Sequence, residues 1–80
     1  MTPPVKRSFT IRGHRTSISL EAPFWEALKE IATGERVSLA GLVARIDEGR
    51  GRIGLSSAVR LHVLAHYRGL ASRAADPKRT

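Results

Sequence analysis

The stretch Arg15-Thr16-Ser17-Ile18-Ser19-Leu20 decides the fold, and it is followed directly by Glu21-Ala22-Pro23-Phe24-Trp25. Polar and apolar side chains alternate along the first six residues, a period of two that is typical of a β-strand with one buried face. One face of this predicted strand carries Thr16, Ile18 and Leu20, and the other carries Arg15, Ser17 and Ser19. The proline that follows suits the first turn of a helix, so the strand is expected to lead into one.

A single strand of this length can neither bury its apolar face nor satisfy its backbone hydrogen bonds. Residues 8–12 alternate too, but Gly13 interrupts them, so either one long strand bends at Gly13 or a first short strand or arm precedes the ribbon. Of the two we favour one continuous extended segment over residues 8–20. The partner strand is then expected to come from a second copy, antiparallel about a two-fold axis. The sequence thus predicts a mainly α fold with one β-strand, in which an intertwined homodimer or larger even multiple forms a two-stranded ribbon between subunits. Such a ribbon fits the major groove of DNA.

Size and composition agree with dimerisation and restrict the cellular location. A chain of 80 residues buries a small core, and without cysteine it has no disulfide to support that core. No apolar run is long enough to span a membrane, and the N-terminus lacks the apolar centre of a signal peptide. We therefore expect a cytoplasmic protein with no membrane partner.

The charge is strongly positive and unevenly distributed. The net charge is +7, and the basic excess lies in residues 1–16 and 53–80. A polyanion is the natural partner for such a chain, with double-stranded nucleic acid ahead of an acidic membrane surface. The alternative is that the charge serves solubility alone.

The chain is expected to form a single domain with a tail at each end. We predict a basic flexible arm over residues 1–7, a domain over residues 8–71 and a basic tail over residues 72–80. The first helix follows Pro23 and is expected to end with Gly34 as a left-handed cap. Ser38 is the predicted cap of the second helix, which leads into a Gly/Arg loop, and a third helix begins at Ser56 or Ser57.

The apolar positions of the strand and the first two helices define the expected dimer core. They recur at helical spacing in each helix, with Trp25 expected beside the stripe of the first helix. The predicted dimer core consists of Ile18, Leu20, Phe24, Leu28, Leu42 and Ile46.

At this point the sequence resembles the ribbon-helix-helix DNA-binding proteins, and among them a small bacterial branch with an extra C-terminal helix. The residues that carry the resemblance are the segment Gly13–Glu21 followed by Phe24-Trp25, and the added segment Leu55–Arg60. The resemblance implies an intertwined homodimer that regulates transcription. It also implies base-reading side chains at three alternating strand positions, here Arg15, Ser17 and Ser19, and a phosphate contact at the start of the second helix, here Ser38 and the amide of Leu39.

The chemistry of these residues supports the same assignment. The planar fork of Arg15 matches O6 and N7 of guanine, and Ser17 and Ser19 can contact several base edges. Lys6, Arg7 and Arg12 are expected to bind phosphates or to enter a minor groove as an arm. For the three strand residues the alternative is an ordinary exposed strand face. For the three basic residues before them it is a solvated arm.

Other classes of function find little support in the sequence. His62 and His66 lie one helical turn apart, but no third ligand is evident, so neither a metal nor a cofactor is expected. No nucleophile motif or P-loop is present, so neither an enzyme nor a small-molecule substrate is expected. The rivals to a DNA-binding regulator are a basic homo-oligomeric interaction protein and an antitoxin-type module that binds a partner.

Overall fold

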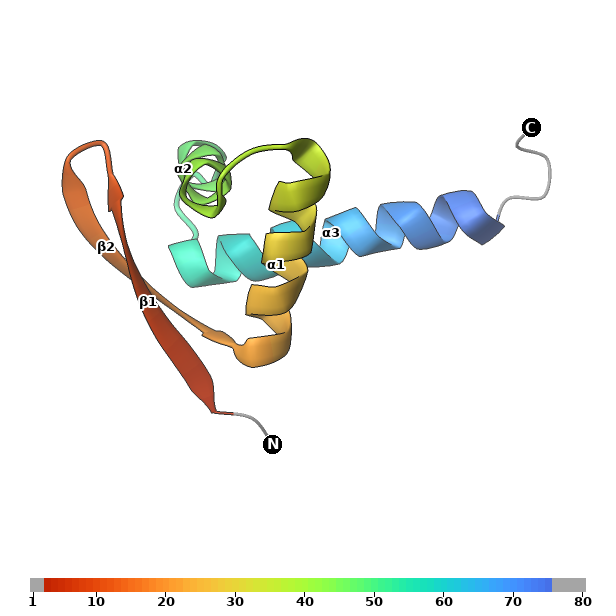
Figure 1. The fold of residues 1–80 in the computed structure, drawn as a ribbon, viewed down its shortest axis with the longest axis horizontal. Helices are drawn as coiled ribbons and strands as arrows, with labels where there is room; N and C mark the ends of the chain where they lie inside the picture. Colours follow the sequence, from red (N-terminus) through yellow and green to blue (C-terminus); the bar gives the residue numbers. More distant parts are fainter. Residues whose placement is uncertain (1–2, 76–80) are drawn as a thin grey trace.

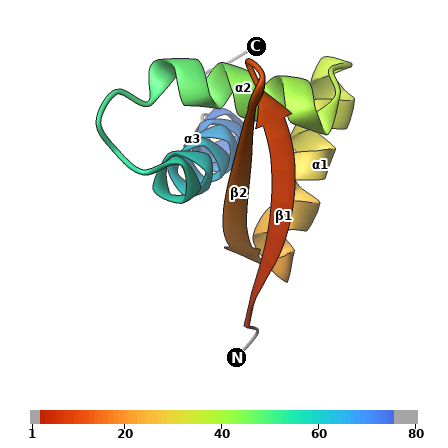
Figure 2. The ribbon, with the colours of Figure 1, turned by 90° about the vertical axis from the view of Figure 1, so that its left-hand side faces the viewer.

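A computed structural model describes residues 3–75 of the chain. Two strands come first, β1 (Pro4–Ile11) and β2 (His14–Glu21), and three helices follow, α1 (Ala22–Glu35), α2 (Leu39–Gly49) and α3 (Leu55–Ala75) (Figure 1). The hairpin lies on one side of the helices, and one of its faces is turned away from them (Figure 2).

The two strands form an antiparallel hairpin within one chain. Residues pair from Pro4 opposite Glu21 to Ile11 opposite His14, with Arg12 and Gly13 as the turn. Both turn residues have positive φ, 53° and 80°, as a tight two-residue hairpin turn requires. The predicted continuous strand over residues 8–20 is therefore wrong, because the chain reverses at Gly13.

This hairpin also changes the predicted N-terminus and the predicted strand partner. Residues 4–7 belong to β1 rather than to a flexible arm, while residues 1–2 lie outside the described part. β2 finds its antiparallel partner in β1, so the chain has two strands instead of the single strand expected. A second copy is therefore not required to satisfy the backbone hydrogen-bonding groups on this edge of β2.

The core lies between the hairpin and the three helices. Five of the six residues predicted for the dimer core are buried within the single chain, and Phe24 is partly buried against them. α3 completes this core with three buried side chains. The buried side chains are Ile11, Ile18, Leu20, Trp25, Leu28, Ile31, Ala32, Leu42, Val43, Ile46, Ala58, Val59 and Val63.

Trp25 on α1 packs against β1. Its side chain is 2% exposed, so it belongs to the core and not to the edge of the stripe as predicted. The indole Nε1 donates a hydrogen bond to the carbonyl oxygen of Val5 at 2.9 Å, and the ring stacks on Phe9 with centroids 5.9 Å apart. The guanidinium of Arg7 lies 5.4 Å from the centre of the indole ring. β1 is therefore held by side-chain packing as well as by the ladder.

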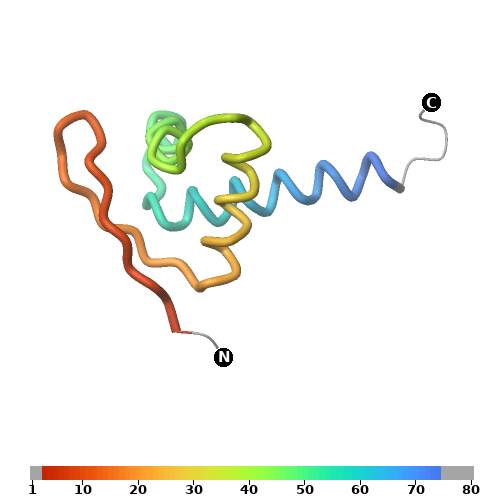
Figure 3. Tube along the Cα trace, in the orientation of Figure 1, coloured from red at the N-terminus to blue at the C-terminus, as the bar shows by residue number. Residues whose placement is uncertain are grey.

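α3 is longer than the sequence indicated and extends past the other helices. It begins at Leu55 and continues to Ala75, so residues 72–75 of the predicted tail are helical, and residues 76–80 lie outside the described part. Figure 3 shows its second half projecting away from the hairpin beyond α1. Leu70 is 44% exposed there, because its turn of the helix has passed the core.

The end of α1 shows which residue takes the left-handed conformation. Gly34 remains inside the helix, and Arg36 has φ 60°. The N–H of Arg36 bonds to the carbonyl of Thr33 and the N–H of Val37 to that of Ala32, the two bonds of a Schellman cap. The predicted cap at Gly34 is wrong by two residues, because the chain accepts a non-glycine residue at the cap.

Replacing Gly34 by alanine is expected to raise the free energy of unfolding by up to about 1 kcal/mol, because alanine loses less entropy in a helix. A Cβ at this position would meet nothing within 4 Å. Urea denaturation followed by circular dichroism measures the change. A loss of stability of similar size would show that Gly34 has positive φ and is the cap after all.

Candidate nucleic-acid interface

The outward face of the hairpin carries a row of polar side chains from both strands. Directly opposed residues of an antiparallel pair share a face, so the register decides which side chains join Arg15, Ser17 and Ser19. Their partners on β1 are Thr10, Ser8 and Lys6, in that order. We call these six residues, Lys6, Ser8, Thr10, Arg15, Ser17 and Ser19, the polar row.

The polar row is accessible. Five of its side chains are exposed and Ser19 is half-buried. The hydroxyls of Ser8 and Ser17 lie 3.3 Å apart across the strands and share a hydrogen bond. The opposite face of the hairpin carries Ile18 and Leu20, which have no exposed surface. The core thus fixes which face of the ribbon remains free.

The three basic residues predicted to contact phosphate are separated by the structure. Lys6 lies in the polar row, whereas Arg7 pairs with Ile18 and points to the helix side, over Trp25. Arg12 is in the turn, where its Nη2 lies 3.2 Å from an oxygen of Glu48 on α2. Both side chains of that pair are more than half exposed, so the pair contributes little to stability.

The predicted cap at the start of α2 is confirmed. The hydroxyl of Ser38 accepts a hydrogen bond from the N–H of Gly41 at 2.9 Å. The amides of the first turn, including that of Leu39, have no acceptor within the helix, as in every α-helix. α2 passes behind the turn end of the hairpin, with its first residues on the β1 side (Figure 2).

A salt bridge joins the base of β2 to α3. Nε and Nη2 of Arg60 lie 3.1–3.3 Å from the carboxylate oxygens of Glu21. A backbone hydrogen bond and then Arg60 hold the pKa of Glu21 below its ordinary value. Sequence reasoning missed this pair, because the two residues are 39 positions apart and nothing in their local patterns connects them.

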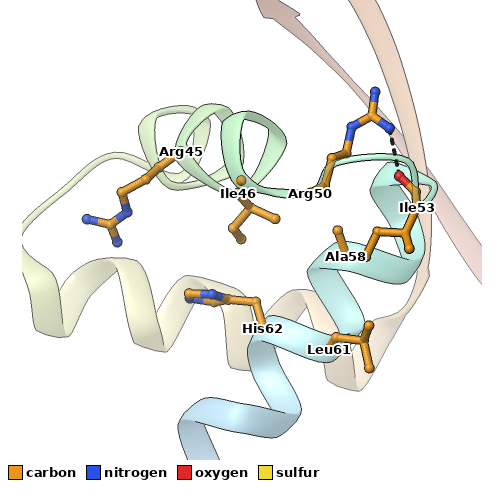
Figure 4. A pocket seen from close by; sticks show the side chains of 8 residues that line it. Arg45, Ile46, Arg50, Ile53, Ala58, Leu61 and His62 are labelled. Carbon is orange, nitrogen blue, oxygen red and sulfur yellow. Dashed lines mark hydrogen bonds between the residues drawn. The ribbon is translucent and has the colours of Figure 1, made fainter.

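A cavity lies away from the polar row, between α2 and α3 (Figure 4). Its volume is about 390 Å³, and its arginines already have partners: Arg45 binds Glu35, and Arg50 binds Asp47 and the carbonyl of Ile53. His62 lines it as well, with a pKa lowered by burial. The lining residues are Arg45, Ile46, Gly49, Arg50, Ile53, Ala58, Leu61 and His62.

Two further properties bear on the class of protein. Within residues 3–75, no three histidine, aspartate or glutamate side chains come together as a metal site would require. No helix in the same part of the chain is long and apolar enough to cross a membrane.

Comparison with known proteins identifies the family. A sequence model described as the ribbon-helix-helix domain matches residues 4–67, which include the hairpin, α1, α2 and the first half of α3. The chain belongs to the ribbon-helix-helix family. Ribbon-helix-helix domains commonly bind DNA and regulate transcription. The searches of curated proteins and of solved structures found no match.

The structure brings together the three residues that the sequence assigned to base reading. It adds Lys6, which the sequence assigned to a phosphate contact, and two residues that the sequence missed. Ser8 and Thr10 were not predicted, although their alternation with Phe9 and Ile11 was visible. A two-residue gap between two alternating segments is a hairpin signal, and Arg12-Gly13 is such a gap. Arginine in place of the usual asparagine or aspartate obscured it.

Proposed function

We propose that this ribbon-helix-helix protein is a sequence-specific DNA-binding protein, a transcriptional regulator of the bacterial cytoplasm, which inserts the hairpin into the major groove. The observation that carries the proposal is the register, because it gathers the polar row on one exposed face of a two-stranded ribbon. Two strands lie about 4.8 Å apart. A groove about 12 Å wide admits them with their side chains.

Each member of the polar row has a chemical role in this proposal. Arg15 reads a guanine through its bidentate fork, and the short hydroxyl side chains let the ribbon approach the base edges closely. Lys6 reaches a phosphate as a point charge. Ser38 and the amide of Leu39 form a second phosphate contact, since a helix N-terminus has free N–H groups and a positive dipole.

We further propose that two copies act together on a roughly palindromic site. Ribbon-helix-helix proteins typically dimerise, and a two-fold dimer places one reading element on each half-site. In the arrangement expected from the sequence, the strands of two copies formed one ribbon. Here each chain already has a two-stranded ribbon, which supports one hairpin for each half-site.

A protein partner is a second candidate, and the surface of α3 favours it. Four large apolar side chains of this helix are exposed, between 36% and 54% of their surface: Leu61, Leu64, Tyr67 and Leu70. A basic interaction protein or an antitoxin-type module would use such a surface. Binding to DNA without sequence preference would support this alternative.

A binding selection from random duplex DNA tests the proposed function. The wild-type protein is expected to enrich a motif with two-fold symmetry whose half-sites each contain a conserved guanine. Enrichment of no motif would contradict sequence-specific recognition.

Salt dependence separates the basic residues. Lys6→Ala is expected to weaken binding to specific and random DNA alike. It is also expected to reduce the slope of the logarithm of the binding constant against the logarithm of salt concentration by about one, because one phosphate is no longer neutralised. Arg7→Ala, which removes the same charge from the other face of β1, is expected to leave that slope nearly unchanged. Fluorescence anisotropy over a salt series measures both. Equal slopes for the two variants would show that the register does not select the DNA-facing residues.

A further inference from the structure

α3 has an apolar side that its own chain leaves uncovered. Leu61, Leu64, Arg68 and Ala71 follow one another at spacings of three, four and three residues, so they lie along one side of the helix. All four are exposed, Leu61 over 54% of its surface and Leu64 over 52%. We call these four residues the outer stripe. Their spacing is the one with which a helix packs along another helix.

The formal charge of α3 is entirely positive. Residues 55–75 contain three arginines and neither aspartate nor glutamate. Arg60 binds Glu21 of β2. Within residues 3–75, by contrast, no carboxylate lies within salt-bridge distance of Arg68. The outer stripe therefore has a guanidinium without a carboxylate partner among its apolar side chains.

The outer stripe adjoins the cavity between α2 and α3, because Leu61 belongs to both (Figure 4). Ile53 lines the same cavity and is 43% exposed, whereas Ile46 and Ala58 are buried. The volume of about 390 Å³ falls in the range of ligand pockets, about 300–1,000 Å³. A second molecule that packs along the stripe can therefore place a large apolar side chain beside Leu61.

The charge of α3 decides which molecule suits this surface. A second copy of α3 would bring its own arginines and no carboxylate, because the helix contains none. Packing two such helices along the outer stripe would take Arg68 out of water without a partner, which is unfavourable. Nucleic acid matches the charge of Arg68 but offers no apolar side chains to the leucines. A helix with both leucine-like side chains and a carboxylate satisfies the whole stripe.

We propose that the outer stripe of α3 binds an amphipathic helix of another protein, which presents apolar side chains to Leu61 and Leu64 and a carboxylate to Arg68. An arginine that pairs with a carboxylate inside an apolar contact is a typical hot spot of a protein interface. The second half of α3 projects away from the hairpin, so the partner does not occupy the polar row (Figure 1). The proposal goes beyond DNA binding and does not depend on it.

Two synthetic helical peptides test this surface in a solution without DNA, so the failure of this proposal and that of the proposed function are separate results. Both peptides carry leucines at heptad spacing. The residue at the centre of the leucine face is glutamate in one peptide and lysine in the other. Fluorescence anisotropy of each labelled peptide with the full chain measures affinity. The glutamate peptide is expected to bind at least about tenfold more tightly, the factor that corresponds to one charge-assisted hydrogen bond.

Arg68→Glu is expected to reverse the order of the two peptides, because it reverses the charge that they meet. Arg15→Glu is the matched control: it makes the same change on the hairpin, and both affinities are expected to stay unchanged. Circular dichroism establishes that each variant is folded, and Arg68→Gln, which is expected to make the two affinities nearly equal, replaces Arg68→Glu if that variant unfolds.

Three results would overturn the proposal. The first is that the wild-type chain binds neither peptide, or binds both equally. The second is that the glutamate peptide keeps its advantage in the folded Arg68 variant. The third is that the chain binds vesicles of phosphatidylglycerol but neither peptide, which would assign the outer stripe to an anionic membrane surface instead of a protein helix.

Discussion

Ile18→Ala is expected to lower the free energy of unfolding by about 2–5 kcal/mol, the usual cost of truncating a fully buried isoleucine. Ile18 has no exposed surface and lies in the core between hairpin and helices. A small domain has about 5–15 kcal/mol of stability in total, so this loss is a large part of it. Urea denaturation followed by circular dichroism gives the value.

Two comparisons make the Ile18 experiment decisive. Ser17→Ala changes the neighbouring residue on the exposed face and is expected to alter stability by at most about 0.5 kcal/mol. Because Ile18 is buried by its own chain, the loss of unfolding free energy caused by Ile18→Ala is expected to be the same over a roughly hundredfold range of protein concentration. If two copies shared the core, unfolding would depend on protein concentration. Similar losses for both variants would contradict the assignment of faces.

Arg15→Ala is expected to weaken binding to the selected DNA site by about 1–3 kcal/mol for each base that the side chain reads, or roughly 5- to 150-fold. It is also expected to relax the preference for one base pair in each half-site. The fold should be retained, since the Arg15 side chain is exposed on the face turned away from the core. Anisotropy with the selected site and a repeated selection measure affinity and preference.

Arg68→Ala is the control for Arg15→Ala, because it removes the same charge from an exposed position on α3. It is expected to change binding only slightly and to leave the selected motif unchanged. The same base preference for wild type and Arg15→Ala would remove Arg15 from the reading residues and favour the interaction-protein alternative.

Most of the secondary structure could be predicted from local patterns. The alternation of Arg15–Leu20, the proline after it and the Ser38 cap are local signals, and the structure contains β2, α1 and α2 where these signals indicated. A separate first strand was only the less favoured alternative to one continuous segment, because an extended segment and a hairpin show the same alternation. Only the turn distinguishes them, and it depends on two positive φ angles, one of them at an arginine.

Only part of the candidate site could be predicted from the sequence. That Arg15, Ser17 and Ser19 share a face follows from a period of two within one strand. The register between the two strands places Lys6 on the same face and Arg7 on the other. A turn of a different length would shift that register. The contacts of Ser56 and Arg60 on α3 with the backbone of Ser19 depend on tertiary packing, and no spacing in the sequence reports them.

Everything proposed for the polar row depends on both strands coming from one chain. Ser8 and Ser17 lie directly opposite each other, with hydroxyl oxygens 3.3 Å apart, and the chain has no cysteine of its own. The double variant Ser8→Cys/Ser17→Cys therefore offers two thiols at a separation that suits a disulfide. After mild oxidation of a dilute sample, a non-reducing gel is expected to show a monomer with no free thiol. A covalent dimer linked from position 8 of one chain to position 17 of another would contradict the single-chain ribbon.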